Sequence, residues 1–147
     1  MLARFLRVII RMLDLVALRI SADDSPEHLR TGSRGEEDAY FEMRKLGYVM
    51  TARNFRSPRC HGEIDLIGWD GDVLCFIEVK TRKTRDVKTP EAAVDRHKRR
   101  EIAEVGREYL RRLPRPCQWR FDVVSVYYDG RNSRPQIEVF RNASLAA

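Results

Sequence analysis

The sequence predicts an α/β domain, a central mixed β-sheet flanked by helices, and three observations support this fold class. Helical and strand patterns alternate in the order helix, three strands, helix, two strands. Hydrophobic residues make up 43% of the chain and charged residues 34%, a composition typical of soluble globular proteins. The length of 147 residues suits one domain with a substantial core.

The N-terminal segment differs from the rest in composition. Residues 1–20, MLARFLRVIIRMLDLVALRI, predict a basic amphipathic helix, because arginines recur among apolar residues every three or four positions. These arginines interrupt the run too often for a membrane span, and no signal cleavage site follows. Such a helix can lie on an anionic membrane surface, bind a partner protein or pack on its own domain. We therefore expect two parts, 1–33 (helix and polar linker) and the folded domain 34–147.

Capping residues and periodicity place two helices in the folded domain. The first is expected over residues 34–45, with Ser33 as its N-cap. The second is expected from Thr89 to Arg112, with Pro90 at its first position and further prolines after its end. Each helix presents an apolar stripe that we expect to face the sheet.

Five strands are expected around these helices. The central hairpin is GEIDLIGWDGDVLCFIEVK, residues 62–80, with a turn at Asp70-Gly71. The other strands are expected over residues 48–53, Trp119–Tyr127 and Gln136–Phe140.

The hairpin carries polar side chains inside apolar strands. Glu63 and Asp65 share one face of the first strand, and Glu78 and Lys80 share one face of the second. A loop with an even number of residues, or a bulge, brings all four side chains to one face of the hairpin. A two-residue loop at Asp70-Gly71 would set Glu63 opposite Glu78, whereas a four-residue loop would set Asp65 opposite Glu78.

Clustered carboxylates on a buried strand repel one another unless a cation lies between them. Mg²⁺, or Mn²⁺, suits such a site because it takes few carboxylates and keeps waters for a substrate phosphate. Lys80 adds a positive charge where a phosphate would develop negative charge. Glu36 and Lys98 interrupt the apolar stripes of the two helices, so both are expected to point toward the sheet. The alternative is an exposed hairpin held by surface ion pairs.

Basic residues concentrate between Lys80 and Arg100. This segment contains nine Lys or Arg and three acidic residues, so its net charge equals the net charge of +6 of the whole chain. Such a cluster attracts polyanions, most commonly nucleic acid, unless it is simply a solvated basic face. Cys60, Cys75 and Cys117 form no Cys-x-x-Cys pair, which argues against a zinc ribbon or a disulfide framework and favours the cytoplasm.

Several motifs resemble those of a known family. Asp65, twelve intervening residues and Glu78-Val79-Lys80 resemble the D…(D/E)-x-K motif of restriction-endonuclease-like nucleases, with Ile64 where the fuller pattern has Pro. The further matches are Gly35-Glu36, Arg53-Asn54-Phe55-Arg56, Gly62 to Ile67, Phe76 to Arg82, Lys98 and Arg120-Phe121-Asp122. In this order and spacing, over about Gly35 to Ala143, the set is similar to the YraN family, small bacterial proteins with a Holliday-junction-resolvase-like fold.

The resemblance implies a metal-dependent nuclease. Asp65 and Glu78 would bind Mg²⁺ or Mn²⁺, Lys80 would orient the attacking water, and Glu36 would complete the catalytic group. Glu63 and Asp122 would support these residues. The residues implied to contact the nucleic-acid backbone are Arg82, Lys83, Arg85, Lys88 and Lys98.

The sequence therefore predicts a cytoplasmic endonuclease that cleaves DNA, branched DNA included, or RNA. Two alternatives stay open. In the first, the chain binds nucleic acid without cleaving it. In the second, it is a membrane-associated scaffold that acts through residues 1–20. A monomer and a homodimer are both compatible with the sequence.

Overall fold

The computed structural model describes residues 27–82, 95–128 and 134–143. Contacts within the chain define two units, Met1–Arg30 and Thr31–Ala147. The helix expected over residues 1–20 lies outside the described residues. In the described part of the chain, no helix combines the length and the apolar character needed to cross a membrane.

The second unit has the predicted order of elements and a mixed sheet. Its five strands lie in the order β1-β2-β3-β4-β5, with β3 and β4 parallel and the other neighbours antiparallel. The α/β class and the mixed sheet are therefore confirmed. The elements are α2 (Glu27–Lys45), β1 (Val49–Phe55), β2 (Ile64–Asp70), β3 (Val73–Arg82), α3 (Arg96–Leu110), β4 (Gln118–Tyr127) and β5 (Gln136–Phe140).

The helix starts differ from the expected ones. Helix α2 begins at Glu27, so Ser33 lies inside the helix and the second half of the expected linker is helical. A glycine within a helix costs only about 1 kcal/mol, which packing against a sheet can offset. Helix α3 begins at Arg96, because the Asp95 side chain caps it by accepting a hydrogen bond from the Lys98 backbone N–H at 2.8 Å. The expected start at Thr89 is therefore wrong for α3.

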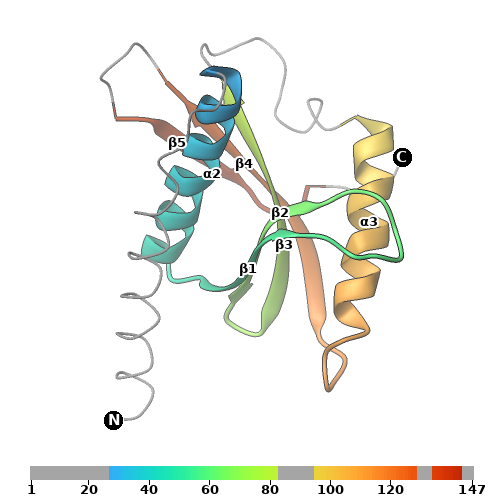
Figure 1. Cartoon of the computed structure of the whole chain (residues 1–147). Coiled ribbons are helices and arrows are strands. Elements are labelled where there is room, and N and C mark those ends of the chain that lie inside the picture. The colour runs from blue at the N-terminus through green and yellow to red at the C-terminus, as the bar shows by residue number, and fades with distance from the viewer. Residues whose placement is uncertain (1–26, 83–94, 129–133, 144–147) are drawn as a thin grey trace. The chain divides into compact units, whose positions relative to one another are not determined.

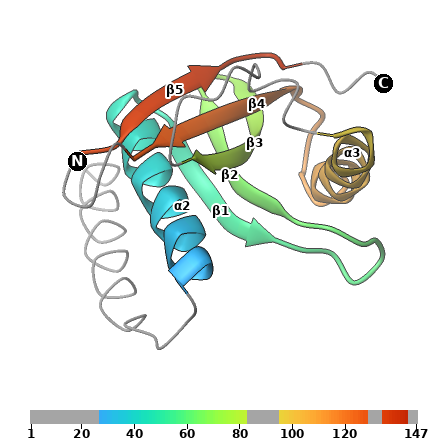
Figure 2. The ribbon, with the colours of Figure 1, turned by 90° about the horizontal axis from the view of Figure 1, so that it is seen from above.

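The two helices cover opposite faces of the sheet (Figure 1 and Figure 2). On one face, α2 packs its buried residues Ala39, Tyr40 and Met43 against Cys75, Ile77 and Val79 of β3. On the other face, α3 packs Ile102 and Val105 against Leu74 and Phe76 of β3. Strand β3 is thus buried on both faces, as its continuous apolar sequence predicts. Leu46, which follows the last residue of α2, is 49% exposed.

The β2–β3 hairpin closes through an even loop, as predicted. Trp69 pairs with Leu74 and Asp70 with Val73, so the loop consists of Gly71 and Asp72 rather than Asp70 and Gly71. The pairing register is nevertheless the one expected for a four-residue loop. Continued by one pair beyond Leu66 and Ile77, it sets Asp65 opposite Glu78. The alternative in which Glu63 lies opposite Glu78 is wrong.

Two glycines let the helices approach β3 closely. A Cβ atom on Gly35 of α2 would lie 1.9 Å from Oγ1 of Thr81. A Cβ atom on Gly106 of α3 would lie 3.2 Å from Cε2 of Phe76. Because Gly35 precedes Glu36, its close packing on the end of β3 determines where the Glu36 carboxylate lies.

Candidate active site

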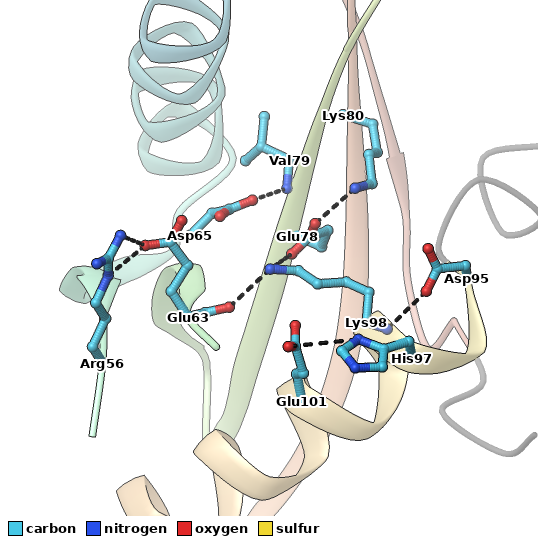
Figure 3. Close-up of polar contacts among 10 residues, drawn as sticks. All are labelled: Arg56, Glu63, Asp65, Glu78, Val79, Lys80, Asp95, His97, Lys98 and Glu101. Atoms are coloured by element: carbon cyan, nitrogen blue, oxygen red, sulfur yellow. Dashed lines mark hydrogen bonds and ion pairs between the residues drawn. The ribbon is translucent and has the colours of Figure 1, made fainter. Parts of the chain in front are cut away.

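The candidate site lies where β2 separates from β3. The ladder between these strands ends at the pair Leu66 and Ile77, and Asp65 then contacts β3 through its side chain. Oδ2 of Asp65 accepts a hydrogen bond of 2.7 Å from the backbone N–H of Val79 (Figure 3). The carboxylate thus replaces the main-chain acceptor that a continued ladder would supply, and its side chain is held in one direction. Asp65 is only 6% exposed.

Glu78 lies between two lysines. Its Oε1 accepts a hydrogen bond of 2.8 Å from Nζ of Lys80. Its Oε2 lies 3.6 Å from Nζ of Lys98, which reaches the site from α3 (Figure 3). Within the described part of the chain, Oε2 is buried and has no hydrogen-bond partner, which is unusual for a carboxylate oxygen. The two lysines therefore balance the negative charge of Glu78, and its Oε2 can still accept a hydrogen bond or bind a cation.

Glu63 joins the site through its backbone and is held outward by its side chain. Its carbonyl oxygen accepts a hydrogen bond of 3.2 Å from Nζ of Lys98. Its carboxylate accepts from Nε of Arg56 at 2.7 Å and lies 2.6 Å from Nη2 of the same arginine. This fork of two contacts orients the carboxylate away from Glu78 (Figure 3). Glu63 thus links the lysine of α3 to the arginine after β1.

Glu36 reaches the same group of charges from α2. Burial raises its pKa above the ordinary value, and the negative charge of Glu63 raises it further. A hydrogen bond from the side chain of Asn54 acts in the opposite direction and holds the carboxylate. Asn54 has a φ of 48°, a left-handed conformation that asparagine tolerates better than most residues. Sequence reasoning gave no role to Asn54 or Arg56, although an asparagine at the end of a strand pattern is itself a signal of a special backbone position.

The electrostatics of Asp65 show how closely the carboxylates are packed. Burial raises the pKa of Asp65 to about 7, and the negative charges of Glu78 and Glu36 add to this effect. The Val79 N–H and the Lys98 ammonium oppose it. The four acidic residues therefore form one interacting group, and additional positive charge at the site would stabilise their ionised forms.

The donor chemistry of this group fits a divalent cation. Mg²⁺ and Mn²⁺ prefer carboxylate and water oxygens, and the unpartnered Oε2 of Glu78 is such a donor beside the buried Asp65. Among residues 27–82, 95–128 and 134–143, no three His, Cys, Asp or Glu side chains are arranged as a complete metal centre. Asp65 and Glu78 would therefore be the protein ligands of a cation, and water or substrate would supply its other ligands.

Asp122 does not join the carboxylate group. It pairs with Ile77 across the parallel strands, so it faces the α2 side of the sheet, whereas Glu78 faces α3. Its carboxylate is fully buried and accepts hydrogen bonds of 2.9 Å from Nε of Arg120 and from the backbone N–H of Asn142. Asp122 therefore lies outside the group of carboxylates, because neighbouring strand residues point to opposite faces, and its supporting role stays a prediction.

The predicted nucleic-acid contacts are only partly described. Lys98 lies in the site itself, and Arg82 ends β3 two residues beyond Lys80. The others, Lys83, Arg85 and Lys88, lie outside the described residues, so their contact with nucleic acid stays a prediction.

Comparison with known proteins places the chain in a family. A family model described as uncharacterised protein family UPF0102 matches residues 35–126, well over half of the chain. The chain belongs to the UPF0102 family. It is 50% identical over 141 residues to a UPF0102 protein of Koribacter versatilis, covering 96% of this chain and 95% of the relative. It is also similar to UPF0102 proteins of Symbiobacterium thermophilum (45% identical over 117 residues, 78% of this chain and 95% of the relative) and Solibacter usitatus (43% over 115 residues, 76% and 83%).

The UPF0102 match includes every residue of the candidate site. Glu36, the β2–β3 hairpin and Lys98 all fall within residues 35–126. Residues 1–34 lie outside the family model, although the match to the Koribacter versatilis protein covers 96% of this chain. The candidate site therefore belongs to the part of the chain that defines the family.

Proposed function

We propose that this UPF0102 protein is a Mg²⁺- or Mn²⁺-dependent endonuclease with a restriction-endonuclease-like fold. Its substrate would be DNA, branched DNA included, or RNA. The observation that supports this proposal most strongly is the buried pair Asp65 and Glu78 with two lysine ammonium groups at the Glu78 carboxylate. A buried carboxylate whose pKa is raised by burial and by a second carboxylate is typical of a catalytic site.

Each residue of the group has a distinct role in this mechanism. Asp65 and Glu78 would hold the cation, and the hydrogen bond from the Val79 N–H fixes the orientation of the Asp65 carboxylate. A bound cation would supply Lewis-acid stabilisation of the phosphate and a more acidic water. Lys80 and Lys98 place positive charge beside Glu78, where an attacked phosphate would gain negative charge.

Glu36 and Lys80 handle the water and the protons in the proposed reaction. Lys80 would orient the attacking water, since its ammonium group donates hydrogen bonds and lies at the exposed end of the carboxylate pair. Glu36, whose pKa is raised by burial, would exchange a proton at a higher pH than an ordinary glutamate does. Asn54 would keep Glu36 directed toward the group.

Cleavage of labelled nucleic acids tests this proposal. Branched, flapped and single-stranded DNA and RNA are incubated with the protein and Mg²⁺ or Mn²⁺. We expect Asp65→Asn to lower the cleavage rate by about a hundredfold or more, because it removes a charged group that acts in the transition state. Asp72→Asn is the matched control, since it removes a carboxylate from the exposed loop of the same hairpin. If wild type and Asp65→Asn act alike on every substrate, the nuclease proposal is wrong.

One observation favours a second candidate, nucleic-acid binding without cleavage. Lys80 and Lys98 already compensate the charge of Glu78, and two carboxylates make a weaker cation site than three would. For such a protein the same assay would show stable complexes with nucleic acid but no product with either cation.

A further inference from the structure

A hollow of about 460 Å³ opens beside the carboxylate group. The loop between β1 and β2 forms one wall with Arg56, Cys60 and His61, and the first turns of α3 form the other with Glu101. Glu63 and Lys98 line the hollow and belong to the candidate site, so the two are continuous. Its volume lies within the range of about 300–1,000 Å³ that is usual for small-molecule sites.

Contacts between the loop and α3 fix the walls of this hollow. Nζ of Lys98 donates to the carbonyl oxygen of Glu63 at 3.2 Å, and Nη1 of Arg59 lies 3.9 Å from Oε2 of Glu108. Gly62 has a φ of 102°, and a Cβ atom there would lie 2.8 Å from Cβ of Glu101. The loop therefore approaches α3 at a point where glycine alone fits, and the hollow is part of the folded structure.

The lining of the hollow combines three chemical features. Arg56, 74% exposed at its side chain, and Lys98 supply positive charge suited to a phosphate. Glu63 and Glu101 supply carboxylate oxygens that can accept hydrogen bonds from N–H groups. His61 is exposed and supplies an aromatic ring on which a planar group can stack.

A nucleotide presents all three complementary features: a phosphate, N–H groups on the edge of its base, and a flat ring. In a duplex the base edge is paired and the ring faces are stacked, so a paired nucleotide offers only its phosphate and sugar to such a hollow. We propose that the hollow holds one unpaired nucleotide of the bound strand, beside the phosphodiester bond that lies at Asp65 and Glu78. This inference rests on the proposed function and narrows its substrates to nucleic acids with a single-stranded segment.

The test measures binding without catalysis. Fluorescence anisotropy in EDTA compares a labelled single-stranded oligonucleotide of about 12 nucleotides with a blunt duplex of the same length. We expect His61→Ala and Arg56→Gln each to weaken single-strand binding roughly tenfold and to change duplex binding by no more than about twofold. Arg134→Gln is the control for Arg56→Gln, since it removes the same charge at the opposite edge of the sheet, before β5.

The outcomes separate this inference from the proposed function. If the duplex binds as tightly as the single strand, or if His61→Ala binds single strands like wild type, the inference is wrong even when cleavage is observed. If the single-strand preference depends on His61 but no substrate is cleaved, the inference stands and the nuclease proposal fails. His61 is exposed, so its variant reports on binding even where Arg56→Gln disturbs folding, and thermal unfolding of each variant checks this.

Discussion

At the scale of single residues, Asp65 combines a favourable contact with an unfavourable charge. Its carboxylate accepts the Val79 N–H at 2.7 Å, so it satisfies a buried backbone donor that would otherwise be unpaired. Burial and the neighbouring Glu78 at the same time raise its pKa to about 7. The native state therefore holds the proton of Asp65 over a pH range in which the unfolded chain has released it.

This shift predicts that stability falls as pH rises. Between the ordinary value of 3.8 and about 7, the native state binds more protons at Asp65 than the unfolded state does. The contribution of Asp65 to the free energy of unfolding then decreases from pH 4 to pH 7, and the raised pKa of Glu36 acts in the same direction. We expect Asp65→Asn, which keeps an acceptor for Val79, to be more stable than wild type at pH 8 by roughly 3 kcal/mol.

Urea unfolding in EDTA at pH 4, 6 and 8 measures this effect. The difference between Asp65→Asn and wild type should shrink toward pH 4, which is close to the ordinary pKa of 3.8, because the carboxyl group of the unfolded chain then also begins to bind its proton. Asp65→Ala serves as the control, because it also removes the acceptor of the Val79 N–H and should be about 1–3 kcal/mol less stable than Asp65→Asn at every pH. Equal pH profiles for wild type and Asp65→Asn would contradict the assigned pKa.

Side-chain direction was the part of the site that sequence could predict. Strand alternation placed Glu78 and Lys80 on one face, and helical periodicity placed Lys98 inward, as the structure has them. That Asp122 lies on the other face could not be predicted, because a motif match carries no information about which face a residue occupies. The bond from Val79 to Asp65 could not be predicted, since it depends on where two strands separate.

At the scale of elements, the packing of α2 on β3 depends on Gly35. A Cβ atom there would lie 1.9 Å from Oγ1 and 3.0 Å from Cβ of Thr81. Rotation of Thr81 can move its hydroxyl group, but the position of its Cβ is set by the strand. Helix α2 would therefore have to shift, and the neighbouring Glu36 would move with it.

We expect Gly35→Ala to destabilise the protein by about 1–3 kcal/mol, the usual cost of overpacking. Gly32→Ala is the matched control on the same helix, because nothing lies within 4 Å of its added Cβ and alanine favours the helix by up to about 1 kcal/mol. Urea unfolding at neutral pH compares the two variants. Adding Thr81→Ala to Gly35→Ala should restore part of the loss, and equal stabilities of Gly35→Ala and Gly32→Ala would show that the contact does not limit packing.

The ends of elements were less predictable than their order. The alternation of periods gave the order of helices and strands, and β5 runs over the expected Gln136–Phe140. Ser33 resembled an N-cap, but α2 continues through it to Glu27. Thr89-Pro90 resembled a helix start, yet Asp95, with extended backbone and a bond to the Lys98 N–H, begins α3. Local capping motifs compete, and the sequence alone does not tell which one the fold uses.

At the scale of the whole molecule, the candidate site assembles side chains from both faces of the sheet and from the hairpin. Glu36 comes from α2, Lys98 from α3, and Asp65 and Glu78 from β2 and β3. These elements meet where β2 separates from β3. The segment from Lys80 to Arg100 has an excess of positive charge equal to the net charge of +6 of the whole chain. This excess would attract an anionic strand toward the carboxylates, and a phosphate can lie beside these carboxylates only if positive charge is close by.

Binding to nucleic acid should therefore depend steeply on salt. Each phosphate contacted by Lys or Arg releases a counterion, so the logarithm of affinity falls against the logarithm of salt with a slope of about 0.7 per contact for single strands. We expect the pair Lys83→Gln and Lys88→Gln to reduce the slope by about 1.4. The pair Lys45→Gln and Arg134→Gln removes the same charge at exposed positions outside the basic segment and should leave the slope close to that of wild type. Anisotropy titrations of one single-stranded oligonucleotide across a salt series measure this slope for both double variants. An unchanged slope for the Lys83→Gln and Lys88→Gln variant would exclude these two lysines from the nucleic-acid interface.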